Sequence, residues 1–150
     1  MIAPLLVLAV GNPSRGDDAL GPGFIARAAV ALADELARGQ LELLTDFQLQ
    51  IEHALDLTGR ARVVFVDASV AAAPPFAFAP VAAAPDRRAI SHALSPAGVL
   101  AAHRDAFGPP PPAWVLAIRG DRFELGEDMS AAARDHLDAA VAFFVGFARA

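Results

Sequence analysis

Uninterrupted apolar runs and segments with a helical period alternate along this chain. Residues 5–10 form the first apolar run, and the segment 62–66 is similarly apolar after its first residue, Arg62. Because neither run alternates between polar and apolar positions, both are typical of strands in a parallel sheet that helices cover on both faces. Residues 41–45 predict a shorter strand, and residues 114–118 predict the last strand of the chain.

A spacing of three to four residues between apolar positions follows the first run. This spacing extends from Asp17 to about Arg38 and predicts a helix, with Gly39 in the right place to cap its C-terminal end. Residues 49–57 predict a second, shorter helix that ends near Gly59. With the strands on either side, these helices give the order β-α-β-α-β.

The second half of the chain is less regular. Phe76 and Phe78 alternate with small residues, which predicts a short strand. Ser95 followed by Pro96 predicts the first turn of a helix that extends to about residue 107. Ser130 is expected to cap a final helix. The predicted apolar face of this helix consists of Ala133, Leu137, Ala140, Val141, Phe144 and Ala148.

This order of elements predicts an α/β fold with a mostly parallel central sheet and helices on both faces. The chain has 150 residues, of which 55% are hydrophobic, and it contains neither internal repeats nor a linker. We therefore expect a single-domain three-layer sandwich over residues 1–150. The first ten residues are apolar but lack the positive flank of a signal peptide, so we interpret them as a buried strand.

Charge and cysteine content exclude several classes of function. The net charge is −5 and no basic run is present, which argues against nucleic acid or an anionic membrane surface as the main partner. The chain has no Cys, so disulfides, a thiol nucleophile and thiolate-bound zinc are all excluded. The absence of Cys fits a reducing cytosol, and we expect a cytoplasmic protein.

Three polar features follow predicted strands, where open parallel sheets bind their ligands. They are the loop 11–18 with its acidic pair Asp17 and Asp18, Asp67 after the third strand, and His92 before the Ser95 helix. Two carboxylates and an imidazole suit zinc, nickel or another divalent ion. With three protein ligands, one position would stay open for water or substrate.

Each of these residues also has a purely structural interpretation. Asp17 or Asp18 can cap the first helix, because a carboxylate satisfies free backbone N–H groups there. Asp67 can simply end a strand, and His92 can be a surface histidine in a loop. Asn12 can form a turn or orient a bound peptide. The residues alone leave these interpretations open.

The segment 6–21 resembles the N-terminal signature of the hydrogenase maturation proteases. That signature consists of an apolar strand, a Gly-Asn pair (here Gly11-Asn12), an acidic pair and a further glycine. The segment 64–68 resembles the second site of this family, a strand that ends in Asp-Ala, and Ser91-His92 resembles the third. Ala19 departs from the family, in which glycine commonly follows the acidic pair.

The resemblance implies a specific reaction and a set of site residues. Members of this family remove a C-terminal extension from the large-subunit precursor of a nickel–iron hydrogenase after nickel insertion. The implied catalytic and metal-binding trio is Asp18, Asp67 and His92. Its metal would be nickel, which the substrate could itself supply, and zinc or cadmium could take its place. The expected partner is the hydrogenase large-subunit precursor, with neither nucleic acid nor membrane.

Further residues are expected to bind this substrate. Asp46 matches an aspartate of the family, and the tract 46–54 resembles a subgroup in which Gln-rich sequence replaces the usual glycines. The segment 119–126 also resembles that subgroup. The expected substrate-binding residues are Asn12, Asp46, Gln48, Gln50 and His53, with residues 119–123 at the rim of the groove.

Two other classes of function stay open. A peptidyl-tRNA hydrolase-like enzyme also has Gly-Asn-Pro after its first strand, but it needs a catalytic histidine soon afterwards, and the first histidine here is His53. A non-enzymatic α/β binding module would use the trio only as structural residues.

His103 and His136 lie beside charged residues on predicted helices, and we expect both to be exposed to solvent.

Overall fold

A five-stranded sheet organises the computed structural model, which describes residues 1–86 and 94–150. The strands lie in the order β2-β1-β3-β5-β4, and only the edge strand β4 is antiparallel to its neighbour. The strands are β1 (Leu5–Val10), β2 (Leu41–Asp46), β3 (Arg62–Ser69), β4 (Phe76–Val81) and β5 (Ala113–Arg119). This sheet confirms the predicted mostly parallel arrangement.

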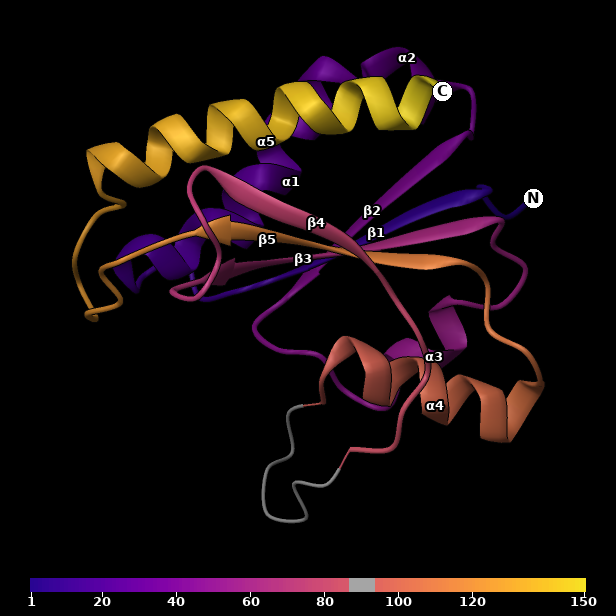
Figure 1. The fold of residues 1–150 in the computed structure, drawn as a ribbon. Helices are drawn as coiled ribbons and strands as arrows, with labels where there is room; N and C mark the ends of the chain where they lie inside the picture. The colour runs from indigo at the N-terminus through magenta and orange to yellow at the C-terminus, as the bar shows by residue number, and fades with distance from the viewer. Residues whose placement is uncertain (87–93) are drawn as a thin grey trace.

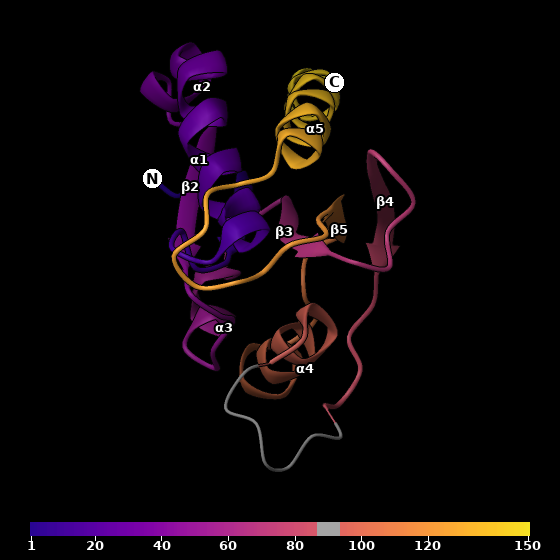
Figure 2. The ribbon, with the colours of Figure 1, turned by 90° about the vertical axis from the view of Figure 1, so that its left-hand side faces the viewer.

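Helices cover both faces of this sheet (Figure 1). The helices α1 (Leu20–Ala31), α2 (Ala33–Ala37) and α5 (Ala131–Arg149) lie on one face, and α3 (His53–Asp56) and α4 (Pro96–Phe107) lie on the other. Figure 2 shows the same layers from the side, with α1 next to α5 and β4 at the far edge. The predicted α/β three-layer fold is therefore confirmed. Within the described segments, no helix combines the length and hydropathy that a membrane span requires.

The uniformly apolar strands fill two separate cores. In β1, Leu5, Val7 and Ala9 belong to the core under α1 and α5. The residues between them belong to the core over α3 and α4. Because side chains alternate across a strand, a strand with helices on both sides must be apolar at every position. This is the physical reason for the uninterrupted run at residues 5–10.

The first predicted helix is divided into three pieces. A 3-10 turn, η1 (Gly16–Ala19), precedes α1, and the helix is interrupted at Leu32, where φ is −115° and ψ is 32°. The spacing of apolar residues continues across this interruption, so spacing alone could not locate it. The predicted cap is confirmed: Gly39 has φ +71°, its N–H donates to Leu36, and the next N–H donates to Glu35.

The second predicted helix is mostly wrong. Only α3 is helical within residues 49–57, because one local and one distant contact replace helical hydrogen bonds before it. The N–H of Gln50 donates to Nδ1 of His53 at 2.8 Å, and the carbonyl of Leu49 accepts from the N–H of Leu94 at 3.1 Å. A side chain that captures a backbone group in this way competes with a helix.

The later elements agree closely with prediction. Both predicted N-caps are confirmed: Oγ of Ser95 accepts the N–H of Gly98, and Oγ of Ser130 accepts the N–H of Ala133. One difference affects the site, because β3 continues past residue 66 and includes Asp67, which is paired with Ala117 of β5. Asp67 therefore does not end its strand.

Two histidines are less exposed than predicted. His103 is buried, and its Nδ1 lies 2.8 Å from the carbonyl oxygen of Ala54. His136 is partly buried, with Nδ1 2.9 Å from the carbonyl oxygen of Arg119. Since a carbonyl can only accept, each ring nitrogen carries a proton and donates. These two rings connect elements of the fold and are not surface groups.

Candidate active site

A pocket of about 240 Å³ opens at the carboxyl ends of β1, β2 and β3, on the face covered by α3 and α4. Among the residues that the structure describes, the charged ones in its lining are Asp18 and Asp67. The other lining residues are Leu8, Val10, Phe47, Gln48, Leu49, Phe65, Val66, Leu94, Ser95, Pro96 and Val115. The pocket thus brings together two members of the predicted trio at the edge where parallel sheets bind ligands.

Asp18 is held in the pocket by the loop after β1. The N–H of Asn12 donates to Oδ2 of Asp18 at 2.7 Å. The side chain of Asn12 stabilises the turn that contains it, because its Oδ1 accepts the N–H of Ser14 at 2.9 Å. Asn12 therefore orients the loop and one carboxylate, and the turn-forming interpretation of its side chain is correct.

Two glycines allow this loop to pack against β1. A Cβ atom on Gly11 would lie 2.0 Å from the carbonyl oxygen of Asp18, and one on Gly21 would lie 2.1 Å from that of Val10. Both contacts are with backbone atoms, so a larger residue would push η1 away from the strand. Ala19, in contrast, has an ordinary helical φ of −72°, and the common family glycine is not needed there.

Asp67 reaches the pocket from the side of β3 that faces α4. Its Oδ1 accepts the N–H of Ala68 at 2.8 Å. The residue as a whole is exposed, but protein atoms crowd its carboxyl group. This loss of water raises the pKa of Asp67 to about 6, the Ala68 hydrogen bond opposes the rise, and the negative charge of Asp18 adds to it.

The two carboxylates fit a divalent cation. Within the described residues, no donor reaches Oδ1 of Asp18 or Oδ2 of Asp67, so each retains an oxygen that can bind a ligand. Burial is the main cause of the raised pKa of Asp67, and a bound cation would relieve the smaller contribution from repulsion by Asp18. Among residues 1–86 and 94–150, no group of three His, Asp or Glu side chains could hold a metal ion by itself.

His92 lies outside the described residues, so its predicted role as the third ligand stays a prediction. Described residues on both sides of this segment are fixed near the pocket. Leu94 and Ser95 line it, and Oδ2 of Asp86 accepts the N–H of Ser95 at 2.7 Å. Gly98 makes room for this carboxylate, since a Cβ atom there would lie 2.4 Å from it.

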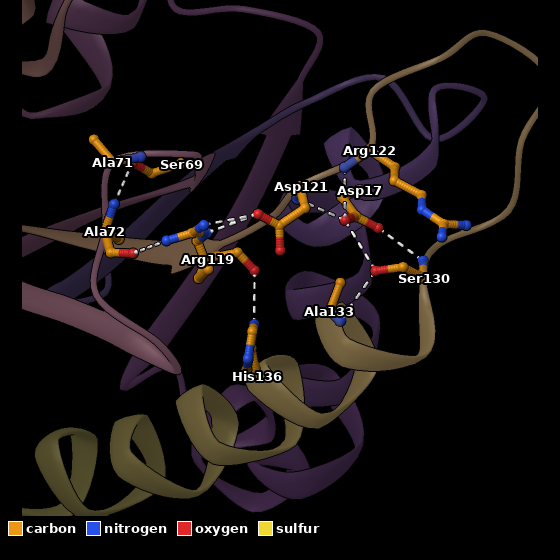
Figure 3. A network of polar contacts seen from close by, with 10 residues as sticks. All are labelled: Asp17, Ser69, Ala71, Ala72, Arg119, Asp121, Arg122, Ser130, Ala133 and His136. Carbon is orange, nitrogen blue, oxygen red and sulfur yellow. Dashed lines mark hydrogen bonds and ion pairs between the residues drawn. The ribbon is translucent and has the colours of Figure 1, made fainter.

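The first member of the acidic pair has a different role from the second. Asp17 is fully buried and accepts hydrogen bonds from the N–H groups of Asp121, Arg122 and Ser130 and from Oγ of Ser130 (Figure 3). Burial raises the pKa of Asp17, but these hydrogen bonds outweigh it and leave the pKa below its usual value. Asp17 therefore joins η1 to the loop before α5.

The predicted groove rim at residues 119–123 is also part of this structural network. Arg119 forms an ion pair with Asp121 at 2.9 Å and donates to the carbonyl of Ala72 at 3.1 Å (Figure 3). In the part of the chain that the structure describes, none of residues 119–123 lines the carboxylate pocket. The loop encloses Asp17, and whether it contacts a substrate stays a prediction.

The other predicted substrate-binding residues surround the pocket to different degrees. Gln48 lines it directly, and Gln50 lines an adjacent hollow. Nε2 of His53 lies 3.4 Å from Oδ2 of Asp46, while its Nδ1 accepts the N–H of Gln50. This pair therefore fixes the segment that carries both glutamines.

Sequence reasoning missed Phe47, which lines the pocket although 69% of its surface is exposed. Its position directly after β2, at the ligand-binding edge of the sheet, is the signal that could have identified it. Leu94 was also missed. Its hydrogen bond to Leu49 has no signature in the sequence.

Solved structures of hydrogenase maturation proteases share this fold. The hydrogenase maturating endopeptidase HybD from E. coli is 20% identical, with a TM-score of 0.70 over 99% of this chain and 93% of that one. The [NiFe] hydrogenase maturation protease HycI from Thermococcus kodakarensis KOD1 is 17% identical, with a TM-score of 0.71 over 99% and 94%. HybD from Thermococcus kodakarensis is 19% identical, with a TM-score of 0.66 over 99% of both chains.

The comparisons by sequence gave no match. No protein-family model matches the chain. No curated protein matches it either. The structural likeness extends over nearly the full length of both chains, so it includes the strand ends that form the pocket. This chain therefore has the fold of the hydrogenase maturation proteases.

Proposed function

We propose that this protein is a cytoplasmic endopeptidase that removes the C-terminal extension of a nickel–iron hydrogenase large-subunit precursor after nickel insertion. The observation that carries the proposal is the pair Asp18 and Asp67 in one pocket at the carboxyl edge of the sheet. The shared fold with proteins named as maturation endopeptidases supports it. The resemblance of the segment 6–21 to the signature of that family also supports it.

In this proposal, the two carboxylates contact the nickel that the precursor carries. Oδ1 of Asp18 and Oδ2 of Asp67 are the oxygens that remain for this contact. His92 is proposed as the third ligand, and zinc or cadmium is expected to replace nickel in binding experiments. Nickel bound to substrate would signal that the precursor is complete, so the cut would follow insertion.

Asp67 is suited to handle a proton during peptide hydrolysis. A carboxylate with a pKa of about 6 accepts a proton near neutral pH more readily than an ordinary aspartate does. Peptide hydrolysis requires a proton to leave the attacking water and another to reach the leaving amine. We assign Asp67 to the first of these transfers, with Oδ1 as the oxygen that takes the proton while Oδ2 contacts the nickel.

The substrate chain is proposed to lie across the 46–53 segment. Gln48 and Gln50 present amide groups at the pocket and at the next hollow, where they can bind a peptide backbone. Asp46 and His53 hold that segment in place. Phe47 offers an apolar surface at the pocket mouth.

Cleavage of purified nickel-loaded precursor tests this function. Wild-type protein should shorten the precursor at one position, whereas Asp67→Asn, Asp18→Asn and His92→Ala should each lower the rate at least about a hundredfold. Asp128→Asn is the matched control, because Asp128 is exposed and does not line the pocket. A precursor that wild type leaves intact would refute the proposed function.

A further inference from the structure

A second surface, separate from the carboxylate pair, lies between α3 and α4. It is a recess of about 600 Å³, which we call the α3/α4 recess. Its lining residues are Ile51, Glu52, Ala54, Leu55, Ala102, Asp105, Ala106 and Phe107. Six of these eight residues are apolar and the other two are acidic. The recess has no role in the reaction described above.

Three large side chains at this recess face solvent. Ile51 is 65% exposed, Leu55 is 63% exposed and Phe107 is 53% exposed. Single exposed apolar residues are common, but a cluster that lines one recess is typical of a binding surface. Ile51 lies in the turn before α3 and Leu55 lies within α3, and both line the same recess.

The recess is connected to the carboxylate pocket. A third hollow, lined in part by Gln50, shares Ile51 and Glu52 with the recess. The same hollow shares Gln48 and Leu94 with the carboxylate pocket. One polypeptide can therefore follow these three hollows without leaving the surface.

The charges at the recess select the kind of side chain that fits. Glu52 and Asp105 are both exposed carboxylates at an otherwise apolar recess. Arg104 lies 3.4 Å from Asp105, but both are exposed, so this pair neutralises the site only weakly. An apolar residue beside an Arg or Lys would satisfy both features of the recess.

The recess is already formed without a partner. His103 of α4 donates from Nδ1 to the carbonyl of Ala54 in α3, and both residues are buried. The His103 ring also packs against Phe107, with 5.3 Å between the ring centroids. Because these contacts fix α3 against α4, binding needs little rearrangement.

We propose that the α3/α4 recess binds an apolar side chain of the precursor, together with a neighbouring Arg or Lys, at some distance along the chain from the cut bond. This inference rests on the proposed function, and it identifies which feature of the substrate is recognised. A second copy of this chain fits poorly, because each copy carries a net charge of −5 and would bring like charges together.

Binding and turnover measurements test the recess directly. Leu55→Gln and Phe107→Gln should weaken binding of nickel-free precursor about tenfold and raise KM for nickel-loaded precursor by a similar factor, with kcat unchanged. Glu52→Gln should reduce the salt dependence of binding. Val30→Gln is the matched control, since Val30 is 81% exposed on α1, on the opposite face. Unchanged KM and affinity in folded Leu55→Gln and Phe107→Gln would overturn the inference.

A peptide selection separates this inference from the proposed function. Random peptides displayed on phage are selected on wild-type protein and then tested on Leu55→Gln. The inference expects enriched sequences with an apolar residue beside Arg or Lys, which Leu55→Gln fails to retain, whether or not the precursor is cleaved. Selected peptides that bind both proteins equally, or a wild-type dimer in sedimentation that Leu55→Gln dissociates, would overturn it.

Discussion

Asp17 and Asp18 are adjacent in the sequence but belong to different parts of the molecule. Asp17 accepts four hydrogen bonds in a fully buried position, whereas Asp18 lines the pocket. Successive residues in a tight turn point in different directions, so one carboxylate can fix the loop while its neighbour faces the pocket. An acidic pair in a sequence does not reveal which residue has the structural role and which one lines the pocket.

Asp17→Asn should destabilise the fold. The amide can accept on only one oxygen, and its NH2 group would face N–H donors that Asp17 now satisfies. We expect a loss of about 2–4 kcal/mol in the free energy of unfolding, measured by urea denaturation. Asp18→Asn, tested beside it, should lose less than about 1 kcal/mol. Equal losses for both variants would contradict the division of roles.

The pKa of Asp67 gives a prediction that does not depend on activity. Carboxyl NMR should detect titration at about pH 6, and Asp18→Asn should lower this pKa because it removes a repelling negative charge. An Asp67 signal that titrates at the ordinary aspartate pKa of 3.8 would refute the described environment.

The raised pKa of Asp67 also predicts how the stability of the fold changes with pH. Because the folded-state pKa of Asp67 lies above 3.8, ionisation opposes folding as the pH rises from about 4 through about 6. Asp67→Asn should therefore raise the melting temperature at pH 7, and the gain should disappear towards pH 4. Exposure of the residue keeps the effect small. Processing by wild type should decline as the pH falls below about 6, when Asp67 becomes protonated.

At the scale of elements, the close contact of α1 with β1 depends on Gly21. Gly21→Ala would place Cβ 2.1 Å from the Val10 carbonyl oxygen, so the start of α1 would have to shift. We expect a loss of about 1–3 kcal/mol or more and a displaced Asp18. Gly146→Ala in α5 is the control, because nothing lies within 4 Å of its Cβ, and it should gain roughly 0.5–1 kcal/mol. Thermal unfolding of both variants checks this contrast.

The short segment before α3 depends on His53. Its ring accepts the Gln50 N–H and approaches Asp46, so His53→Ala should release the segment without unfolding the protein. We expect faster amide hydrogen exchange at Gln50 and a higher KM for precursor, with little change in kcat. His53→Asn, whose carbonyl can accept the same N–H, should recover part of the protection. Identical exchange in wild type and His53→Ala would show that the ring does not position the segment.

Prediction from sequence succeeded where one local rule determined the outcome. Uniformly apolar runs identified the buried strands, and Ser95 and Ser130 identified two helix starts. Prediction from sequence failed where a contact with a distant part of the chain determined the local structure. The N–H of Leu94 donates to the carbonyl of Leu49, and the ring of His103 in α4 donates to the carbonyl of Ala54 in α3. Such partners are brought together only by the fold, so spacing within one segment could not predict them.

At the scale of the whole molecule, the site was predictable in outline. Strand ends meet at one edge of a parallel sheet, which is why Asp18 and Asp67 share a pocket as expected. The lining of the pocket was harder to predict, because residues 119–123 fold around Asp17 and do not line it. Where a loop packs depends on how the helices pack against the sheet, and no single motif encodes that packing.

The sheet divides the apolar interior into two clusters that, within the described chain, share no buried residue. Substitutions at positions that are far apart and share no partner have nearly additive effects on stability. The cluster under α1 and α5 contains Phe24 and Phe144, while the carboxylate pocket and the α3/α4 recess lie on the other side. It follows that recognition can diversify on one side during evolution while the opposite side continues to support the fold.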